Sequence, residues 1–206
     1  MDQDKLQSLR CAGALLAGSA VLAAVLMHYH PHGDDTSGMI RGVHGGLLAL
    51  IVVQPAVLFL VARGLGWSLF TALAFAFFLF GTMGAVLAGA INGFVVPAVW
   101  GYPEGQIGPG VTQLAWELNQ AFATLGAIAA GLGIALFGAA LWQSGWRITA
   151  VLGLLAGAIP AALLIAGVID MHFYGALWTY VTQLSWLTWL GVALYRAAGI
   201  SSPSSP

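Results

Sequence analysis

The chain has 206 residues, of which 60% are hydrophobic and only 6% are charged, and its formal net charge at pH 7 is −1. Soluble domains carry about 25% charged residues, so this composition excludes a soluble domain and is typical of a multi-pass membrane protein. Basic runs are absent from the sequence, so we expect no nucleic-acid partner. The single cysteine, Cys11, excludes an intrachain disulfide.

Six apolar runs are long enough to cross a bilayer, which takes about 20 residues of helix. They occupy nearly the whole chain, so we predict one all-α domain over residues 1–200, a bundle of six transmembrane helices. A disordered Ser/Pro tail is expected at 201–206. The predicted helices cover residues 9–28, 39–63, 67–97, 111–142, 147–169 and 173–197.

The basic residues predict the orientation of the bundle, because Lys and Arg stay preferentially on the cytoplasmic side of a membrane. Only Arg41 falls on one side of the predicted helices. The other side holds Lys5, Arg10, Arg63, Arg147 and Arg196. We therefore expect both termini in the cytoplasm, and the compact, Ala- and Gly-rich form suggests a bacterial inner membrane.

The first predicted outer loop begins with a run of histidines. In an extended segment alternate side chains share a face, so His28, His30 and His32 can point the same way. Histidine is the commonest metal ligand among side chains. His28, at the helix end, is the stronger candidate, because a solvated polar loop accounts equally well for His30 and His32.

The second predicted helix carries Arg41 and His44 near its outer end, and Gln54 deep within it. Gln54 needs a hydrogen-bond partner at that depth. Asp170 and His172 follow the fifth predicted helix, on the same outer side.

These groups suggest two kinds of cofactor. Together, His28, His44, Asp170 and His172 predict a divalent-metal site, with nitrogen and oxygen ligands that do not choose among the transition metals. A b-type haem between two histidines is the weaker alternative, because only His44 is clearly within a helix.

A polar stripe runs along the start of the fourth predicted helix. Gln113, Glu117 and Gln120 follow three- and four-residue spacing, which places them on one face. Asn92 lies near the outer end of the third helix. Polar faces should meet inside the bundle, because lipid would leave them unsatisfied. We predict an outward-facing polar cavity in which these four residues and Arg41 bind a small ligand.

Small residues recur at four-residue intervals in two helices and predict close helix packing. They are Gly81, Ala85, Gly89 and Gly93 in the third helix, and Ala123, Ala127, Gly131, Ala135 and Ala139 in the fourth.

A short internal repeat is also visible. The segments 111–116 and 181–186 are identical at five of six positions, and Met27-His28-Tyr29 resembles Met171-His172-Phe173. The pattern suggests three repeated helical hairpins, with coincidence among frequent membrane residues as the alternative.

These observations favour a multi-pass protein that binds or transports a small ligand or divalent metal in an outward-facing cavity. Two alternatives stay open. One is a metal-dependent hydrolase or oxidoreductase at the outer leaflet, with Glu117 or Asp170 as general base. The other is a structural or assembly subunit of a membrane complex. Besides the lipid bilayer, an oligomeric partner is compatible with the sequence, which contains no motif that identifies a substrate.

Overall fold

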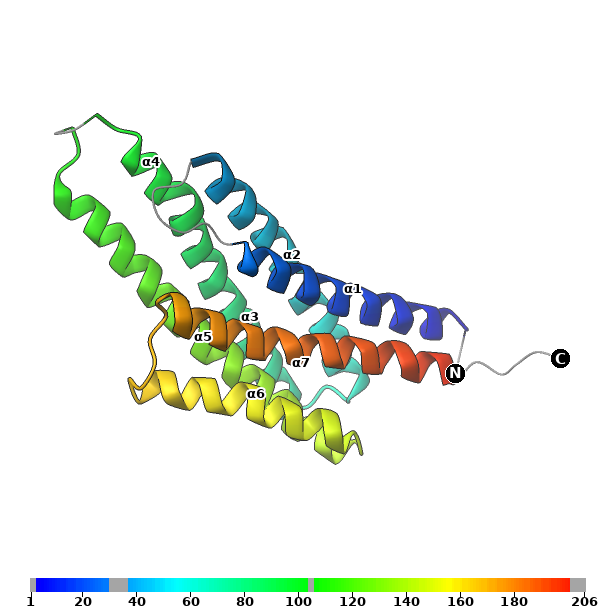
Figure 1. The fold of residues 1–206 in the computed structure, drawn as a ribbon. Coiled ribbons are helices and arrows are strands. Elements are labelled where there is room, and N and C mark those ends of the chain that lie inside the picture. Colours follow the sequence, from blue (N-terminus) through cyan, green and yellow to red (C-terminus); the bar gives the residue numbers. More distant parts are fainter. Residues whose placement is uncertain (1–2, 30–36, 104–105, 201–206) are drawn as a thin grey trace.

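The computed structural model describes residues 3–29, 37–103 and 106–200, and it is helical throughout apart from short connections (Figure 1). The predicted all-α class and the six long helical segments are confirmed for these residues. The helices are α1 (Gln3–His28), α2 (Ser37–Gly64), α3 (Leu69–Ala90), the π-helical turn η1 (Ile91–Val95), α4 (Val96–Trp100), α5 (Pro109–Gln143), α6 (Arg147–Ile165) and α7 (Phe173–Ile200).

Several helices differ from their predicted extents: α1 begins at Gln3, six residues before its predicted start, and α7 runs on to Ile200. The third predicted helix corresponds to α3, η1 and α4 together, and it runs on to Trp100. The α6 helix ends at Ile165, four residues before its predicted end. Gly167 follows with a φ of +66°, a left-handed conformation that glycine adopts readily at the end of a helix.

Among the described residues, five segments are long and apolar enough to span a membrane: Leu6–His28, Gly38–Gly64, Leu69–Trp100, Gly110–Gln143 and Arg147–Ile165. The α7 helix is as long as α2, with 28 residues, but is not one of these five. Its sequence is interrupted by Trp, Tyr, Thr and Gln, which lower its hydropathy. By helix length and composition, the protein is therefore of the multi-pass membrane class.

The long helices form a closed ring. Each packs against the next in the order α1, α2, α3, α5, α6, α7, and α7 returns to α1. Figure 1 shows α1 and α7 side by side, although they lie at opposite ends of the chain. The core of the bundle is consequently enclosed by helices that are distant in sequence.

Three helix pairs approach so closely that a Cβ on their glycines would collide with the partner backbone. Between α3 and α5, a Cβ on Gly84 would lie 2.6 Å from the Cα of Gly126. Between α5 and α6, a Cβ on Gly138 would lie 2.8 Å from the Ala150 carbonyl oxygen, and between α1 and α7 a Cβ on Gly13 would lie 2.6 Å from the Gly191 carbonyl oxygen. Small residues allow this approach where lipid offers no hydrophobic gain on helix association.

The predicted small-residue stripes contribute to these contacts only in part. Gly81 faces the backbone of α5, and Gly131 faces that of α6. In contrast, Gly89 and Gly93 face side chains of α2.

Polar groups of α7 attach it to the helices beside it. The indole Nε1 of Trp186 donates to the Thr149 carbonyl at 2.9 Å, and that of Trp189 donates to the Thr149 hydroxyl at 3.1 Å. Gln183 Nε2 donates to the Ala127 carbonyl of α5 at 3.0 Å. The residues that lower the hydropathy of α7 thus include those that hold it in the bundle.

The two copies of the repeated hexapeptide lie in different environments. Trp186 is 2% exposed, whereas its counterpart Trp116 is 39% exposed. Gln183 is buried, whereas Gln113 is exposed. The common origin of three hairpins therefore stays a prediction.

Candidate functional site

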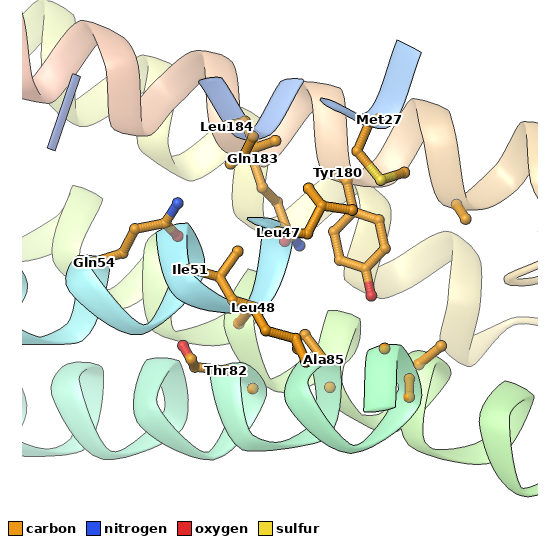
Figure 2. Close-up of a pocket in the computed structure, with 18 of the residues that line it drawn as sticks. Met27, Leu47, Leu48, Ile51, Gln54, Thr82, Ala85, Tyr180, Gln183 and Leu184 are labelled. Carbon is orange, nitrogen blue, oxygen red and sulfur yellow. The ribbon is translucent and has the colours of Figure 1, made fainter. Parts of the chain in front are cut away.

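A cavity of about 180 Å³ lies inside the ring, between α1, α2, α3, η1, α5 and α7 (Figure 2). Most of its lining is aliphatic. Its polar side chains are those of His44, Gln54, Thr82, Asn92, Asn119, Tyr180 and Gln183. No Asp, Glu, Lys or Arg is among the described residues that line it.

His44 marks the end of the cavity nearer the start of α2. The residue is 5% exposed, and its Nδ1 donates to the Ile40 carbonyl at 2.8 Å. In a neutral imidazole this leaves Nε2 as an acceptor. The ring lies against Gly93 in η1, where a Cβ would collide with the His44 side chain. The π turn and its glycine therefore make the space that His44 occupies, and Asn92 in the same turn lines the cavity.

Gln54 marks the opposite end. It follows His44 by ten residues of α2, which is about 15 Å along the helix axis. Its side chain is 4% exposed, and its amide Nε2 is buried without a hydrogen-bond partner in the described part of the chain. A buried donor in that state costs about 1–3 kcal/mol. The partner that the sequence demands for Gln54 is thus not supplied by these residues.

The α7 side of the cavity is amphipathic. Figure 2 shows Tyr180 and Gln183 extending from α7 toward Leu47 and Leu48 of α2. Because Gln183 Nε2 is bonded to the Ala127 carbonyl, this amide is fixed in place. Thr82 on α3, in contrast, donates within its own helix, to the Phe78 carbonyl at 3.0 Å.

Of the five predicted ligand-binding residues, the structure places Asn92 in the cavity wall. Gln113 and Glu117 are exposed and bond to each other, with 2.6 Å between Gln113 Nε2 and Glu117 Oε1. Gln120 is half-buried, Arg41 is exposed, and neither lines the cavity. Residues four apart share a helix face, and α5 turns the face of Gln113 and Glu117 away from the cavity.

The predicted metal cluster does not form in the part of the chain that the structure describes, which corrects that expectation. No group of three or more His, Cys, Asp or Glu lies together there. His44 is buried in the bundle, whereas Asp170 and His172 are exposed in the loop before α7 and His28 is exposed at the end of α1. His30 and His32 lie outside the described residues.

Asp170 and His172 form a local pair in place of a metal site. His172 Nδ1 lies 2.9 Å from Asp170 Oδ2, and the His172 backbone N–H donates to Asp170 Oδ1 at 2.9 Å. These bonds, the backbone one first, hold the pKa of the Asp170 carboxyl below its ordinary value of 3.8. The pair lies in the connection between α6 and α7.

Several cavity residues were not among the predicted site residues: Gln54, Thr82, Asn119, Tyr180 and Gln183. One signal was available for Gln54, because a lone amide in an otherwise apolar helix is costly unless it is used. Asn119 lies between Glu117 and Gln120 in the sequence, but it is buried whereas Glu117 is exposed. The rotation of α5 about its axis decides which of these side chains faces the cavity.

In comparisons with known proteins, no protein-family model, curated protein or solved structure matches this chain. The class of the protein follows from its own fold. It is an all-α bundle with five apolar segments, among the residues described, that are long enough to span a membrane.

Proposed function

We propose that this protein is a multi-pass membrane protein that binds a small, uncharged ligand in the cavity between His44 and Gln54. The observation that carries the proposal is the buried Gln54 amide, which has no partner in the described part of the chain and belongs to the cavity wall. Buried polar groups in native proteins are nearly always hydrogen-bonded, so an orphaned donor beside a cavity calls for an explanation. A ligand with a carbonyl, ester or ether oxygen satisfies it.

The ligand is uncharged because the described wall of the cavity offers no charged side chain to pair with it. Burying an unpaired ion costs far more than burying a neutral polar group. The acids that were candidate general bases, Glu117 and Asp170, are exposed and do not line the cavity. Binding of a neutral molecule is therefore better supported than metal transport or hydrolysis.

The proposal includes the orientation of the bundle. Arg63 lies at the end of α2 and Arg147 at the start of α6. Figure 1 shows these two helix ends opposite to the starts of α2 and α7, near which His44 and Met171 lie in the sequence. With the basic end in the cytoplasm, the His44 end of the cavity faces the outside. In a bacterium this is the periplasmic side of the inner membrane.

The test compares two equal substitutions on α5. Ala123 is buried and lines the cavity, whereas Ala121 is exposed two residues away. The protein is purified in nanodiscs, and the small molecules that copurify are extracted and identified by mass spectrometry. Ala123→Leu fills the cavity, so we expect it to lose the bound molecule that the unchanged protein and Ala121→Leu retain. Equal content in the two variants, or none in the unchanged protein, contradicts the proposal.

A further inference from the structure

A second hollow, of about 580 Å³, lies between α1 and α7 on the outer surface of the ring. Its wall consists of Val21, Ala24, Val25, His28, Tyr29, Leu184, Ser185 and Thr188. Its four α1 residues all belong to the apolar segment Leu6–His28, and Val21 and Val25 are both 46% exposed. We call this hollow the α1–α7 groove. In a membrane it faces the acyl chains of the outer leaflet.

The groove has an apolar floor and a polar rim. Thr188 donates its hydroxyl to the Leu184 carbonyl at 2.9 Å, so it presents little polarity to the groove. At the rim, the rings of His28 and Tyr29 meet edge to face with 5.3 Å between their centroids. Aromatic side chains with a polar tip are enriched at the level of lipid head groups. This arrangement suits a hydrocarbon chain below and a membrane–water interface above.

One side chain belongs to both hollows. Leu184 lines the cavity and the groove, and it is 7% exposed. On α1, Ala23 lines the cavity and its neighbour Ala24 lines the groove. Among the described residues, Leu184 is the one that lines both hollows, so its side chain lies between them.

The helix pair is held together at its other end. A Cβ on Gly13 would lie 2.6 Å from Gly191 O, and one on Gly191 would lie 2.6 Å from Ala17 N. The pair is thus closely packed toward the termini of the chain and hollowed toward His28. A movement of the Leu184 side chain joins groove and cavity without separating this packed end.

We infer that the ligand of the proposed cavity is an uncharged single-chain lipid that enters from the outer leaflet between α1 and α7. This inference rests on the proposed function. The neutral head group occupies the cavity, where Gln54 donates to one of its oxygens, and the chain lies along the apolar floor of the groove, below the rim of His28 and Tyr29. Leu184 moves aside to admit it.

The experiment uses 1-oleoylglycerol as the probe, in phosphatidylcholine nanodiscs that contain the full chain. A version of the probe with a photoreactive diazirine in its head group locates the bound molecule by mass spectrometry of crosslinked peptides. A ¹³C-labelled version measures how fast added probe replaces bound probe.

Three variants distinguish the effect of the Leu184 barrier from the effect of changing the cavity wall. Leu184→Ala opens the wall, and Leu184→Phe thickens it. Leu187→Ala is the matched control, because Leu187 lies one turn along α7, is 2% exposed, and lines the cavity but not the groove. We expect head-group crosslinks in the cavity wall and exchange about tenfold faster in Leu184→Ala than in Leu187→Ala, since changes at a route of entry and exit appear mainly in rates. Leu184→Phe is expected to exchange more slowly than the unchanged protein.

Two results overturn the inference. If crosslinks form in the cavity but Leu184→Ala and Leu187→Ala exchange at the same rate, the cavity binds the probe and the lateral route is wrong. If crosslinks are confined to the groove in every variant, no head group enters the cavity. The comparison of Ala123→Leu with Ala121→Leu then tests separately whether the cavity binds a neutral ligand.

Discussion

Two glutamines in one cavity show how the same residue type acquires different roles. Gln183 is buried and donates to the Ala127 carbonyl at 3.0 Å, whereas the amide nitrogen of Gln54 is buried with no partner in the described part of the chain. The first amide joins α7 to α5. The second costs stability in the absence of a ligand, which is the property expected of a group that serves binding.

Replacing each glutamine with leucine tests this difference. In ligand-free protein, Gln54→Leu removes an unsatisfied donor, so we expect the free energy of unfolding to rise by about 1–3 kcal/mol. Gln183→Leu removes a made hydrogen bond, so we expect it to fall by about 1 kcal/mol. Chemical unfolding in detergent micelles, followed by tryptophan fluorescence, measures both. A loss of stability in Gln54→Leu as large as that in Gln183→Leu would show that Gln54 is already satisfied.

At the scale of the elements, glycines set which helices become close neighbours. A Cβ added to Gly84 would lie only 2.6 Å from the Cα of Gly126, so α3 and α5 pack backbone to backbone. On α1, in contrast, Gly18 is exposed and has nothing within 4 Å of its Cβ position. Glycine content alone does not distinguish these two positions.

Alanine substitutions at these glycines should have opposite effects. Gly84→Ala forces α3 and α5 apart, and we expect it to lower the free energy of unfolding by about 1–3 kcal/mol. Gly18→Ala adds a methyl group in open space and improves helix propensity, so it should raise stability by up to about 1 kcal/mol. Thermal unfolding of both variants in one detergent provides the measurement. Equal effects would mean that the α3–α5 contact is looser than the structure shows.

At the scale of the whole molecule, the ring places the connections of the helices at two opposite ends. Ser144, between α5 and α6, is exposed at the end that carries Arg63 and Arg147. Gln106, between α4 and α5, is exposed at the other end. These two positions report the orientation of the bundle in a membrane.

Cysteine labelling in cells tests the proposed orientation. Cys11 is exposed, so Cys11→Ser is the background for Gln106→Cys and Ser144→Cys. A membrane-impermeant maleimide should label position 106 in intact cells with an opened outer membrane. It should reach position 144 only after the inner membrane is permeabilised. The reverse pattern would place the termini outside and contradict the positive-inside assignment.

The candidate site was predicted less completely than the fold, and α5 shows why. The stripe of Gln113, Glu117 and Gln120 was correctly placed on a helix, but Gln113 and Glu117 are exposed and Asn119 lines the cavity. A polar stripe specifies a face and not the direction in which that face points. The inward direction of α5 is fixed by Gly126, Gly133 and Gly138, which face α3 and α6.

The membrane class and the helical segments follow from the amino-acid sequence, because runs of about 20 apolar residues leave the backbone no other way to satisfy its hydrogen bonds in lipid. The rotation of each helix, and hence the set of residues that line the cavity, follows only from the packing of the folded bundle. Lipid and protein interior are equally apolar, so hydrophobicity does not orient a membrane helix. Backbone contacts at glycines such as Gly84, and hydrogen bonds such as that of Trp186, orient the helices instead. They bring Gln54 and Leu184 into one cavity from distant parts of the chain.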